Sequence, residues 1–532
     1  MNCTSTLTDY RGTGFYSKII LDYLEGKEQL KPFYAHPVSV AGIKAAIENR
    51  DKYPTNRKLL VEILNKHYKD NAPTTRQQLN IGLLSKNNTY SITTAHQPNI
   101  FTGHLYFIYK ILHTIKLCEQ LKNEMPENNY VPVFYMGSED ADLDELGHIF
   151  INGNKHFWET KQTGAVGRMK VDKGLQKMLS DIAGEITVEP FGKDIIDTMS
   201  ACYTEGATIE QATFKLINIL FGSYGLLVLL PDDAEYKRAF NSVTEKELKE
   251  QFSYKIVEHT VSNFPKEYKV QAAGRALNMF YLKDDLRERI EKLNDQYTVV
   301  NTEYSFSEKE MMEELHEHPE RFSPNVILRP VFQEMILPNI AFIGGGGELA
   351  YWLELKKVFD AVLVPYPVLI LRNSFLLAEK KQIEKISQLG FSVIDLFKPK
   401  EDLLNALVKR ETTVQLSLQN EKKTLQEFYD TIKKVSGEVD VTLIQHTDAL
   451  RKQAVRKIEV LEKKMLKAEK KKFEAQQRQI QKIKLQLFPH NNLQERIENF
   501  MSFYAKYGRQ FIDTVYEFSL GVEQEFCIIE LK

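Results

Sequence analysis

The sequence predicts an α/β protein in which a mainly parallel sheet is followed by a long helical hairpin. Three observations lead to this fold class. Short runs of β-forming residues alternate with helical stretches from Tyr90 to about Asn373, as in sheets built from β-α-β units. Apolar residues then recur at heptad spacing from about Leu377 to Leu487, and the chain closes with a short apolar run, Phe526–Leu531.

The first region is expected to hold the sheet and the helices that cover it. Helical patterns precede the first strand, and the strand-sized runs are separated by long stretches. This spacing indicates insertions into the sheet rather than a compact nucleotide fold. The expected helices are Ile43–Glu48, Arg57–Tyr68 and His104–Leu121, and the expected strands are Tyr90–Ala95, Tyr130–Tyr135, Leu226–Leu230 and Ala361–Leu371.

The second region carries two heptad segments separated by Gly437 and its neighbours. Apolar residues at heptad spacing predict helices that pack along a common seam. We therefore expect an antiparallel coiled-coil arm. The seam positions are Leu418, Leu425, Phe428, Ile432 and Val435, then Ala454, Ile458, Leu461, Met465 and Ala468, with a shifted phase at Leu466, Phe473, Ile480 and Leu487.

These patterns divide the chain into three parts. Residues 1–376 are expected to form the core with its N-terminal helices and insertions, and residues 377–487 the arm. Residues 488–532 are expected to return to the core, because an apolar strand left unpaired beyond the arm would be an aggregation hazard.

The composition is typical of a globular protein in a reducing compartment. Of 532 residues, 43% are hydrophobic and 27% charged, and the net charge of -2 creates no overall field that would attract nucleic acid or an anionic membrane. The four cysteines form no C-x-x-C pair, which excludes a disulfide framework or zinc ribbon. No run reaches the ~18 apolar residues of a membrane span, so we expect a cytoplasmic protein without membrane contact.

The arm is locally basic. From Arg451 to Leu487, thirteen Lys or Arg residues stand against four Glu. Such a run can bind RNA or nucleotide phosphates. It is more often the solvated face of a long helix, and aromatic residues for base stacking are nearly absent apart from Phe473. We therefore favour an interaction arm and do not expect nucleic acid as a partner.

Polar side chains follow the first strand, in the segment Thr94–His104. Pro98 and Gly103 force a turn there, and open α/β sheets bind ligands where their strands end. The next helix would direct its N-terminal amides at this crevice, where an anion is favoured. A tight connection with a helix cap is an equally good interpretation. The side chains that offer polar contacts are His96, Asn99, Thr102 and His104.

An acidic block, Gly137–Glu145, follows the second strand. Its five carboxylates suit a cation or a substrate amine, and they equally suit the first turn of a solvated helix. An EF-hand calcium site is excluded, because Glu145 replaces the required glycine and Ile151 the closing glutamate. Because this block and the first loop follow strands of the same sheet, we favour a binding role.

A glycine run, Gly344–Gly347, precedes Glu348 and an amphipathic stretch. Glycines let the backbone approach a ligand closely and turn several amides onto an anion. The run is not a Walker loop, because no Lys-Ser/Thr follows it, and a flexible linker is an equally good interpretation. Arg329 and Arg372 suit carboxylate or phosphate groups, although most arginines form surface ion pairs.

Together these segments resemble the bacillithiol-biosynthesis cysteine-adding enzyme family, BshC. The resemblance covers nearly the whole chain, and several separated motifs occur in the family's order. The chain departs from the family pattern at His104, Ala141 and Gly346, so no catalytic role is carried over to positions 104 and 141. The matching segments are His96–Gly103, Gly137–Glu145 with His148, Glu320–Val326, Arg329–Glu334 and Gly347–Trp352, followed by the coiled coil.

The resemblance implies a Rossmann-like core with connecting insertions, a homodimer paired through the coiled coil, and addition of L-cysteine to glucosaminyl malate. It also implies a distant relation to nucleotidyltransferase and class I aminoacyl-tRNA synthetase cores. An amide does not form favourably in water without an activated carboxylate, so we expect ATP or another nucleotide as a co-substrate.

On this basis we assign expected roles to the candidate residues. His96 and Asn99 would stabilise developing negative charge. Asp140, Asp142 and Asp144 would bind the cationic amine, or Mg²⁺ as the alternative, and no residue is assigned as an obligatory metal ligand. The candidates for binding substrate or nucleotide are Gln97, Thr102, Gly103, Glu139, Arg329, Gly344, Gly345, Gly346, Gly347, Glu348 and Arg372.

Two other classes of function stay open at this point. One is an RNA-binding protein that uses the basic arm beside a synthetase-like core, and the other is a scaffold whose arm is its whole function. The enzymatic interpretation requires the segments that begin at His96, Gly137 and Gly344 to meet at one edge of the sheet.

Overall fold

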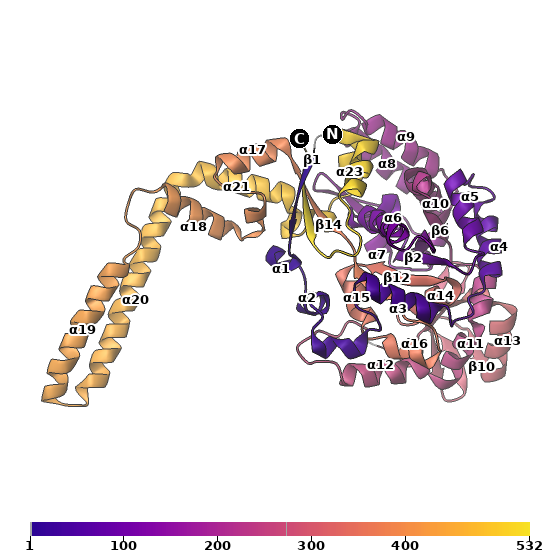
Figure 1. Cartoon of the computed structure of the whole chain (residues 1–532), viewed down its shortest axis with the longest axis horizontal. Coiled ribbons are helices and arrows are strands. Elements are labelled where there is room, and N and C mark those ends of the chain that lie inside the picture. Colours follow the sequence, from indigo (N-terminus) through magenta and orange to yellow (C-terminus); the bar gives the residue numbers. More distant parts are fainter. Residues whose placement is uncertain (1–2, 273, 532) are drawn as a thin grey trace. The chain divides into compact units, whose positions relative to one another are not determined.

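The structure, a computed structural model, describes residues 3–272 and 274–531. Contacts between the described residues divide them into two compact units, one of residues up to Leu376 with Asn492–Ile529, and one of Leu377–Asn491 with Glu530 and Leu531. The predicted fold class is confirmed, because the first unit contains a parallel sheet with helices and the second a helical hairpin (Figure 1).

Among the described residues, no helix combines the length and apolar character needed to cross a membrane.

Five parallel strands form the central sheet, in the order β13-β12-β2-β3-β6. All are buried almost completely, as expected for a parallel sheet covered on both faces. Because the strands are parallel, their carboxyl ends share one edge, where His96 pairs with Met136 and Gly344 with Leu371. The strands are β2 (Thr89–His96), β3 (Asn129–Met136), β6 (Leu227–Leu229), β12 (Asn339–Gly344) and β13 (Val368–Leu371).

Two strands differ from the sequence-based prediction. The strand β12 was not predicted. Its apolar residues run directly into the glycine run, so they were not separated from it as a strand. The predicted strand Ala361–Leu371 is wrong in its first half, because Ala361 ends helix α16 (Lys356–Ala361) and only Val368–Leu371 is extended. Leu363 has a left-handed φ of +57°, which interrupts extended backbone before Val368.

Helices cover the sheet as the periodicity predicted. The helix α6 (Tyr106–Glu124) connects β2 to β3 and packs against both, and α3 (Val40–Arg50) packs against β12 and β13. Their buried side chains share one apolar cluster with the strands, which includes Ile43 and Leu117. The predicted helix Arg57–Tyr68 is present as α4 with the same bounds.

An insertion between β6 and β12 forms a second, antiparallel sheet in the order β10-β9-β8-β7-β11. This sheet was not predicted. Leu286, Ile290 and Leu293 on β8 are four and three residues apart, a spacing that favours a helix when tertiary contacts are unknown. The strands are β7 (Met279–Lys283), β8 (Leu286–Leu293), β9 (Gln296–Val299), β10 (Ser305–Ser307) and β11 (Phe322–Pro324), and the helices α11 (Ala234–Glu250), α12 (Phe252–Ser262), α13 (Glu308–Glu317) and α14 (Arg329–Ile336) accompany them.

The C-terminal segment contributes helices and a strand to the first unit. Helices α22 (Met501–Tyr507) and α23 (Arg509–Glu517) pack on each other, and β15 (Phe526–Leu531) lies between β1 (Cys3–Thr8) and β14 (Ser374–Glu379) in a three-stranded sheet. The last apolar run is therefore a paired strand rather than an exposed edge.

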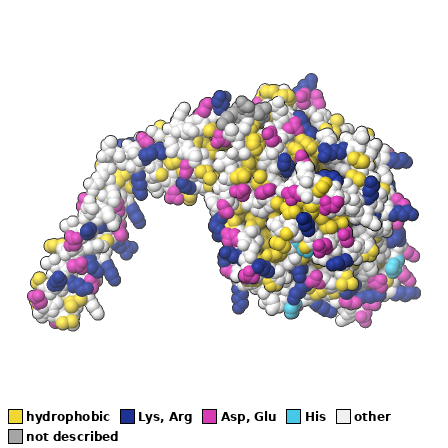
Figure 2. All heavy atoms as spheres, viewed as in Figure 1, with side chains coloured by type: hydrophobic (Ala, Val, Ile, Leu, Met, Phe, Trp, Pro, Cys, Tyr) yellow, Lys and Arg dark blue, Asp and Glu magenta, His cyan; other side chains and the backbone are white. Residues whose placement is uncertain are grey.

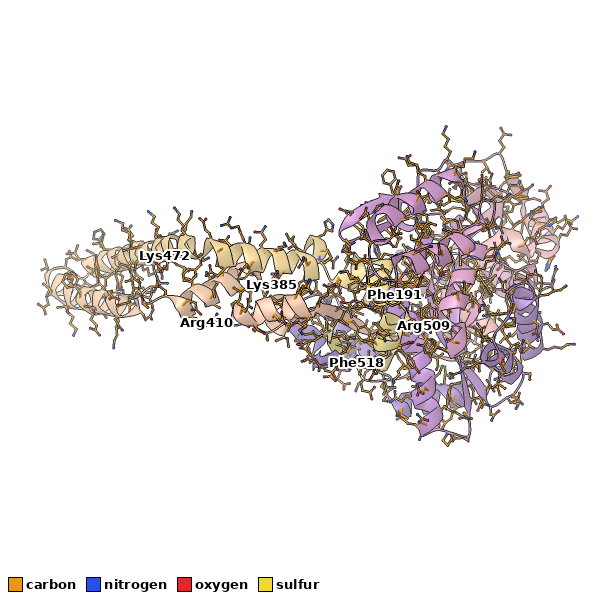
Figure 3. The ribbon with its side chains drawn as sticks, turned by 90° about the horizontal axis from the view of Figure 1, so that it is seen from above. Phe191, Lys385, Arg410, Lys472, Arg509 and Phe518 are labelled. Atoms are coloured by element: carbon orange, nitrogen blue, oxygen red, sulfur yellow. The ribbon has the colours of Figure 1, made fainter. Side chains whose placement is uncertain are left out.

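The second unit contains the coiled coil. Helices α19 (Gln419–Val439) and α20 (Leu443–Lys470) lie side by side and antiparallel (Figure 1), and the turn between them follows Val439, so Gly437 lies inside α19. The predicted phase shift falls where α20 ends and α21 (Glu474–Leu487) begins after a short 3-10 turn. Charged side chains of both signs line this unit (Figure 2), and Lys385, Arg410 and Lys472 lie along it (Figure 3). The antiparallel coiled-coil arm is confirmed, but the predicted seam is wrong in part, because Phe428, Val435 and Leu461 are more than half exposed rather than packed between the helices.

Candidate active site

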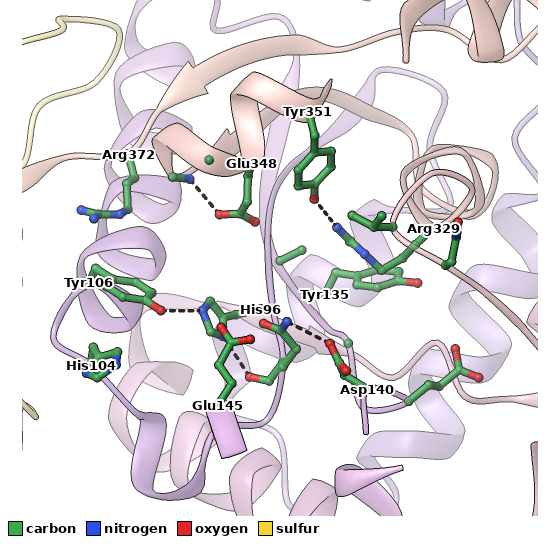
Figure 4. Close-up of a pocket in the computed structure, with 18 of the residues that line it drawn as sticks. His96, His104, Tyr106, Tyr135, Asp140, Glu145, Arg329, Glu348, Tyr351 and Arg372 are labelled. Carbon is green, nitrogen blue, oxygen red and sulfur yellow. Dashed lines mark hydrogen bonds between the residues drawn. The ribbon is translucent and has the colours of Figure 1, made fainter. Parts of the chain in front are cut away.

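One pocket lies where the strands of the parallel sheet end, with a volume of about 560 Å³. The loop that begins at His96, the acidic block and the glycine run all reach it (Figure 4). The three segments therefore meet at one edge of the sheet, as the enzymatic interpretation requires. The lining residues include Ala95, His96, Gln97, His104, Tyr106, Tyr135, Gly137, Glu139, Asp140, Glu145, Arg287, Ser323, Asn325, Arg329, Gly345, Gly346, Gly347, Glu348, Tyr351, Arg372, Asn492 and Arg496.

His96 enters the pocket as a neutral ring. Its Nδ1 lies 3.1 Å from the carbonyl oxygen of Gln97, and its Nε2 lies 3.2 Å from the hydroxyl oxygen of Tyr106. Because a carbonyl oxygen only accepts, Nδ1 carries the proton and Nε2 accepts the hydroxyl proton. Burial and the charge of Lys110 lower the pKa of His96 to about 3. In this arrangement His96 Nε2 is a hydrogen-bond acceptor. We expected His96 to donate a hydrogen bond that stabilises developing negative charge, and the structure does not place it in that role.

A partly buried ion pair joins helix α6, which follows the first loop, to Glu348 at the end of the glycine run. Lys110 Nζ donates to Glu348 Oε2 and to the carbonyl oxygen of Ala95, both at 2.6 Å, and Glu348 Oε2 also accepts the amide of Gly345 at 2.8 Å. Burial raises the pKa of Glu348, but the charges of Lys110 and His96 and the hydrogen bonds from Lys110 and Gly345 together outweigh this effect and hold that pKa below its usual value. The glycine run is therefore fixed in place rather than a flexible linker.

The two predicted arginines reach the pocket with different partners. Arg329 Nη2 donates to the Tyr351 hydroxyl at 2.8 Å, and its guanidinium lies 5.8 Å from the Tyr135 ring centroid. Arg372 forms a 2.8 Å ion pair with the fully buried Glu495. The charge of Arg372 is thus balanced within the protein, whereas Arg329 has no carboxylate partner among the described residues.

Three carboxylates of the acidic block line the pocket. Asp140 accepts a hydrogen bond from Gln97 Nε2 at 3.0 Å, and Glu145 lies at the same wall (Figure 4). Glu139 is largely buried and pairs with the buried Lys237. The pocket consequently has an acidic wall made by Asp140 and Glu145, opposite the glycine run and the arginines.

Asp142 and Asp144 lie outside this wall, contrary to the prediction that three aspartates act together. Asp142 caps the short helix α7 (Leu143–Leu146) by accepting the Glu145 amide at 3.1 Å, and Asp144 is exposed to solvent. Only Leu143–Leu146 is helical, so Asp144 and Glu145 are rotated by about 100° from each other, while the side chain of Asp142 turns to cap that helix.

Asn99, Thr102 and Gly103 lie behind the pocket wall rather than in it. The side chains of Asn99 and Thr102 are buried, and Gly103 has φ +66°, with Asn99 so close that a Cβ would meet it at 2.8 Å. Asn499, 398 residues away from Phe101 along the chain, donates to the carbonyl oxygens of Phe101 and Gly103. These contacts shape the loop from behind, which corrects the predicted contact roles of Asn99, Thr102 and Gly103.

Gly344 likewise ends β12 in the interior, where its carbonyl oxygen accepts the Arg372 amide at 2.9 Å. The remaining glycines, 345 to 347, line the pocket as predicted.

Several lining residues were not among the predicted ones. Arg287 and Ser323 come from the unpredicted antiparallel sheet, and Asn492 and Arg496 from the C-terminal segment. Ser323 lies in the matching segment Glu320–Val326, and Glu145 in the acidic block, whereas no local motif marks Arg287, Asn492 or Arg496. Within residues 3–272 and 274–531, no group of three or more His, Cys, Asp or Glu side chains is arranged to hold a metal ion.

Comparison with known proteins assigns the whole chain to one family. Residues 1–373 match the family model described as "Bacillithiol biosynthesis BshC, N-terminal Rossmann-like domain", and residues 375–531 match "Bacillithiol biosynthesis BshC, C-terminal coiled-coil domain". Relatives named "Putative cysteine ligase BshC" are 39% identical in Flavobacterium johnsoniae, over 98% of this chain and 99% of that protein, and 38% identical in Cytophaga hutchinsonii, over 94% of each. A relative of the same name in Bacillus cytotoxicus is 26% identical over 96% of this chain and 98% of its own length. The chain therefore belongs to the BshC family of bacillithiol biosynthesis.

Proposed function

We propose that this protein is a cysteine ligase that joins L-cysteine to glucosaminyl malate, with nucleotide-dependent activation of the cysteine carboxylate. The names of the relatives support the reaction class. The amide forms when the sugar amine nitrogen attacks the activated carbonyl carbon, the bond to the leaving oxygen breaks, and the amine loses a proton. A nucleotide, when bound, supplies the leaving group.

The observation that carries this proposal is the opposition of charges across one pocket. Asp140 and Glu145 form an acidic wall, and Arg329 with the amides of Gly346 and Gly347 faces it. The acidic wall suits a cationic amine, and the opposite side suits the carboxylates of the malyl group or a phosphate. A pocket with both properties can bring an amine and an activated carboxylate together.

Glu145 is the group that we expect to take the proton from the amine. Partial burial, together with the negative charges of Asp140 and Asp142, raises the pKa of Glu145. A raised pKa makes a carboxylate a better proton acceptor near neutral pH. Asp140, held by Gln97, would orient the ammonium group before the proton leaves.

The proposal is tested by incubating the purified protein with glucosaminyl malate, L-cysteine and ATP and following the thiol product by mass spectrometry. We expect Asp140→Asn to lower the rate at least tenfold, since one charge-assisted hydrogen bond is lost. Asp144→Asn is the matched control, because Asp144 lies in the same block, exposed to solvent and outside the pocket, and its rate should stay within about twofold.

Absence of product from the wild-type protein with any nucleotide, together with normal bacillithiol in a deletion strain, would overturn the assignment. An absorbance spectrum of the purified protein dominated by nucleic acid would instead support the RNA-binding alternative.

We also propose that the protein is a homodimer through the coiled coil. Apolar side chains stay exposed on the hairpin, with Val439 78% and Phe428 60% accessible, and such residues at heptad spacing favour a further helical partner. Light scattering should give twice the 61.7 kDa chain mass. Phe428→Glu combined with Val435→Glu should give the monomer, and Lys434→Glu, on the same helix, should not.

A further inference from the structure

One wall of the pocket comes from the inserted antiparallel sheet. On β7, Phe280 pairs with Arg289 of β8 on one side and with Ser323 of β11 on the other. Directly paired residues in an antiparallel sheet point to the same face, as do residues two apart on one strand. Arg287 and Ser323 therefore flank Phe280 on one face, and both line the pocket.

Arg287 is held in place without a carboxylate partner. Its guanidinium lies over the Phe280 ring, 3.8 Å from the centroid, which fixes its plane and keeps its edge available. Its Nε is buried and has no hydrogen-bond partner within the described ranges. Asp140 and Glu139 influence Arg287 electrostatically, but the described part of the chain contains no ion pair between Arg287 and a carboxylate.

Ser323 adds a second unsatisfied group at the same wall. The residue is 0% exposed, and its Oγ has no hydrogen-bond partner in residues 3–272 and 274–531. An unpaired buried hydroxyl is unfavourable, and a hydrogen bond to a ligand oxygen would remove this penalty. Arg329, whose Nη2 binds Tyr351, lies at the same pocket and supplies a further guanidinium.

From this arrangement we propose that Arg287, Ser323 and Arg329 form a carboxylate-binding subsite of the pocket. All three side chains can donate hydrogen bonds, and guanidinium planes match the planar, bidentate geometry of a carboxylate. Asp140 and Glu139 nearby disfavour a doubly charged phosphate more strongly than a singly charged carboxylate. The bound carboxylate is that of L-cysteine or of the malyl group. These two candidates rest on the proposed function, because both molecules are its substrates.

The subsite is tested by calorimetric titration of the full-length protein with L-malate and with L-cysteine. We expect Arg287→Gln to weaken the binding of one probe at least tenfold and Ser323→Ala by about threefold to tenfold. Arg287→Lys keeps the charge but not the planar fork, so it should weaken binding by about fivefold. Arg289→Gln is the matched control, on the same strand and face but outside the pocket, and should leave the affinity unchanged.

The probe that loses affinity identifies the source of the carboxylate. As a further control, the amide or methyl ester of that probe is titrated into the wild-type protein. Its affinity should be no higher than that of the acid for Arg287→Gln. The proposal is overturned if the wild-type protein binds neither probe, or if well-folded Arg287→Gln and Ser323→Ala bind both as the wild-type protein does.

Because titration measures binding without turnover, the ligase function and the carboxylate-binding subsite can be refuted independently. Probe binding that depends on Arg287, without any ligation product, would count against the ligase function and support the subsite. Ligation by Arg287→Gln with unchanged KM for both substrates would overturn the subsite and leave the ligase function standing.

Discussion

Ion pairs in the core and in the arm have similar lengths but different surroundings. In the core, Arg372 and Glu495 are 2.8 Å apart, with side chains 5% and 0% exposed. In the arm, Lys433 and Asp448 are 2.6 Å apart, with side chains 35% and 29% exposed. Water screens the second pair and can replace either partner, whereas loss of one partner in the first pair leaves a buried charge. Distance alone therefore does not indicate what an ion pair contributes.

The largest effect is expected when the buried pair is broken. Glu495→Gln leaves Arg372 without a counter-charge in the interior, which should lower the free energy of unfolding by about 3–5 kcal/mol. Urea unfolding followed by circular dichroism measures this change. Glu517→Gln, an exposed glutamate in the same C-terminal segment, serves as the control. Equal unfolding midpoints for the two variants would mean that burial does not set the value of the pair.

A smaller effect is expected at the pair that joins helix α6 to the end of the glycine run. Lys110→Met removes the partner of Glu348, whose side chain is partly reached by water, so the free energy of unfolding should fall by about 2 kcal/mol. The double variant Lys110→Met with Glu348→Leu should recover most of this loss. No recovery in the same urea titration would show that Lys110 acts through its packing.

The core and the arm should also differ in the sign of their pH dependence. Burial, with the nearby charge of Asp232, raises the pKa of Glu210 to about 7. Between pH ~4.3 and 7 the folded protein therefore holds a proton that the unfolded chain has lost, so stability falls as pH rises through this window.

Glu210→Gln should flatten this part of the stability curve measured by thermal unfolding at several pH values. In the arm, the hydrogen bond from Lys433 lowers the pKa of Asp448, so its contribution is present above the unfolded pKa and lost as pH falls. If the stability curve of Glu210→Gln has the same pH dependence as that of the wild-type protein, the assignment of a buried, protonated Glu210 is contradicted.

The smallest effect is expected in the arm. Lys433→Ala removes the partner of Asp448 where both side chains contact water, so the free energy of unfolding should change by only about 0.2–1 kcal/mol. Differential scanning calorimetry of the full chain would detect a larger loss as a clear shift of the transition. A loss of the size expected for Glu495→Gln would remove the distinction between the two regions.

The convergence of the first two loops could be predicted from sequence because it depends on local patterns, whereas strand β12, which brings the glycine run to the same edge, was not predicted. Strand-sized runs end at His96 and before Gly137, and parallel strands place their carboxyl ends together whatever the details of packing. The arm could be predicted for a similar reason, since heptad spacing specifies a seam between neighbouring helices.

The remaining parts of the site depend on contacts between distant segments. Asn99 and Thr102 look like ligand-binding residues until Asn499 is seen to bind the back of their loop. Arg287 reaches the pocket only because β8 is a strand, and its local spacing of apolar residues favours a helix. Sequence patterns that are read locally cannot show either contact, because each is decided by tertiary packing.

A crystal structure with glucosaminyl malate and L-cysteine bound tests most directly whether the pocket at the sheet edge is the ligase site. We expect both molecules inside the pocket, with a carboxylate against Arg329 and the amine beside Asp140 or Glu145. Ordered binding of both substrates elsewhere on the protein, with these side chains out of contact, would contradict the assignment.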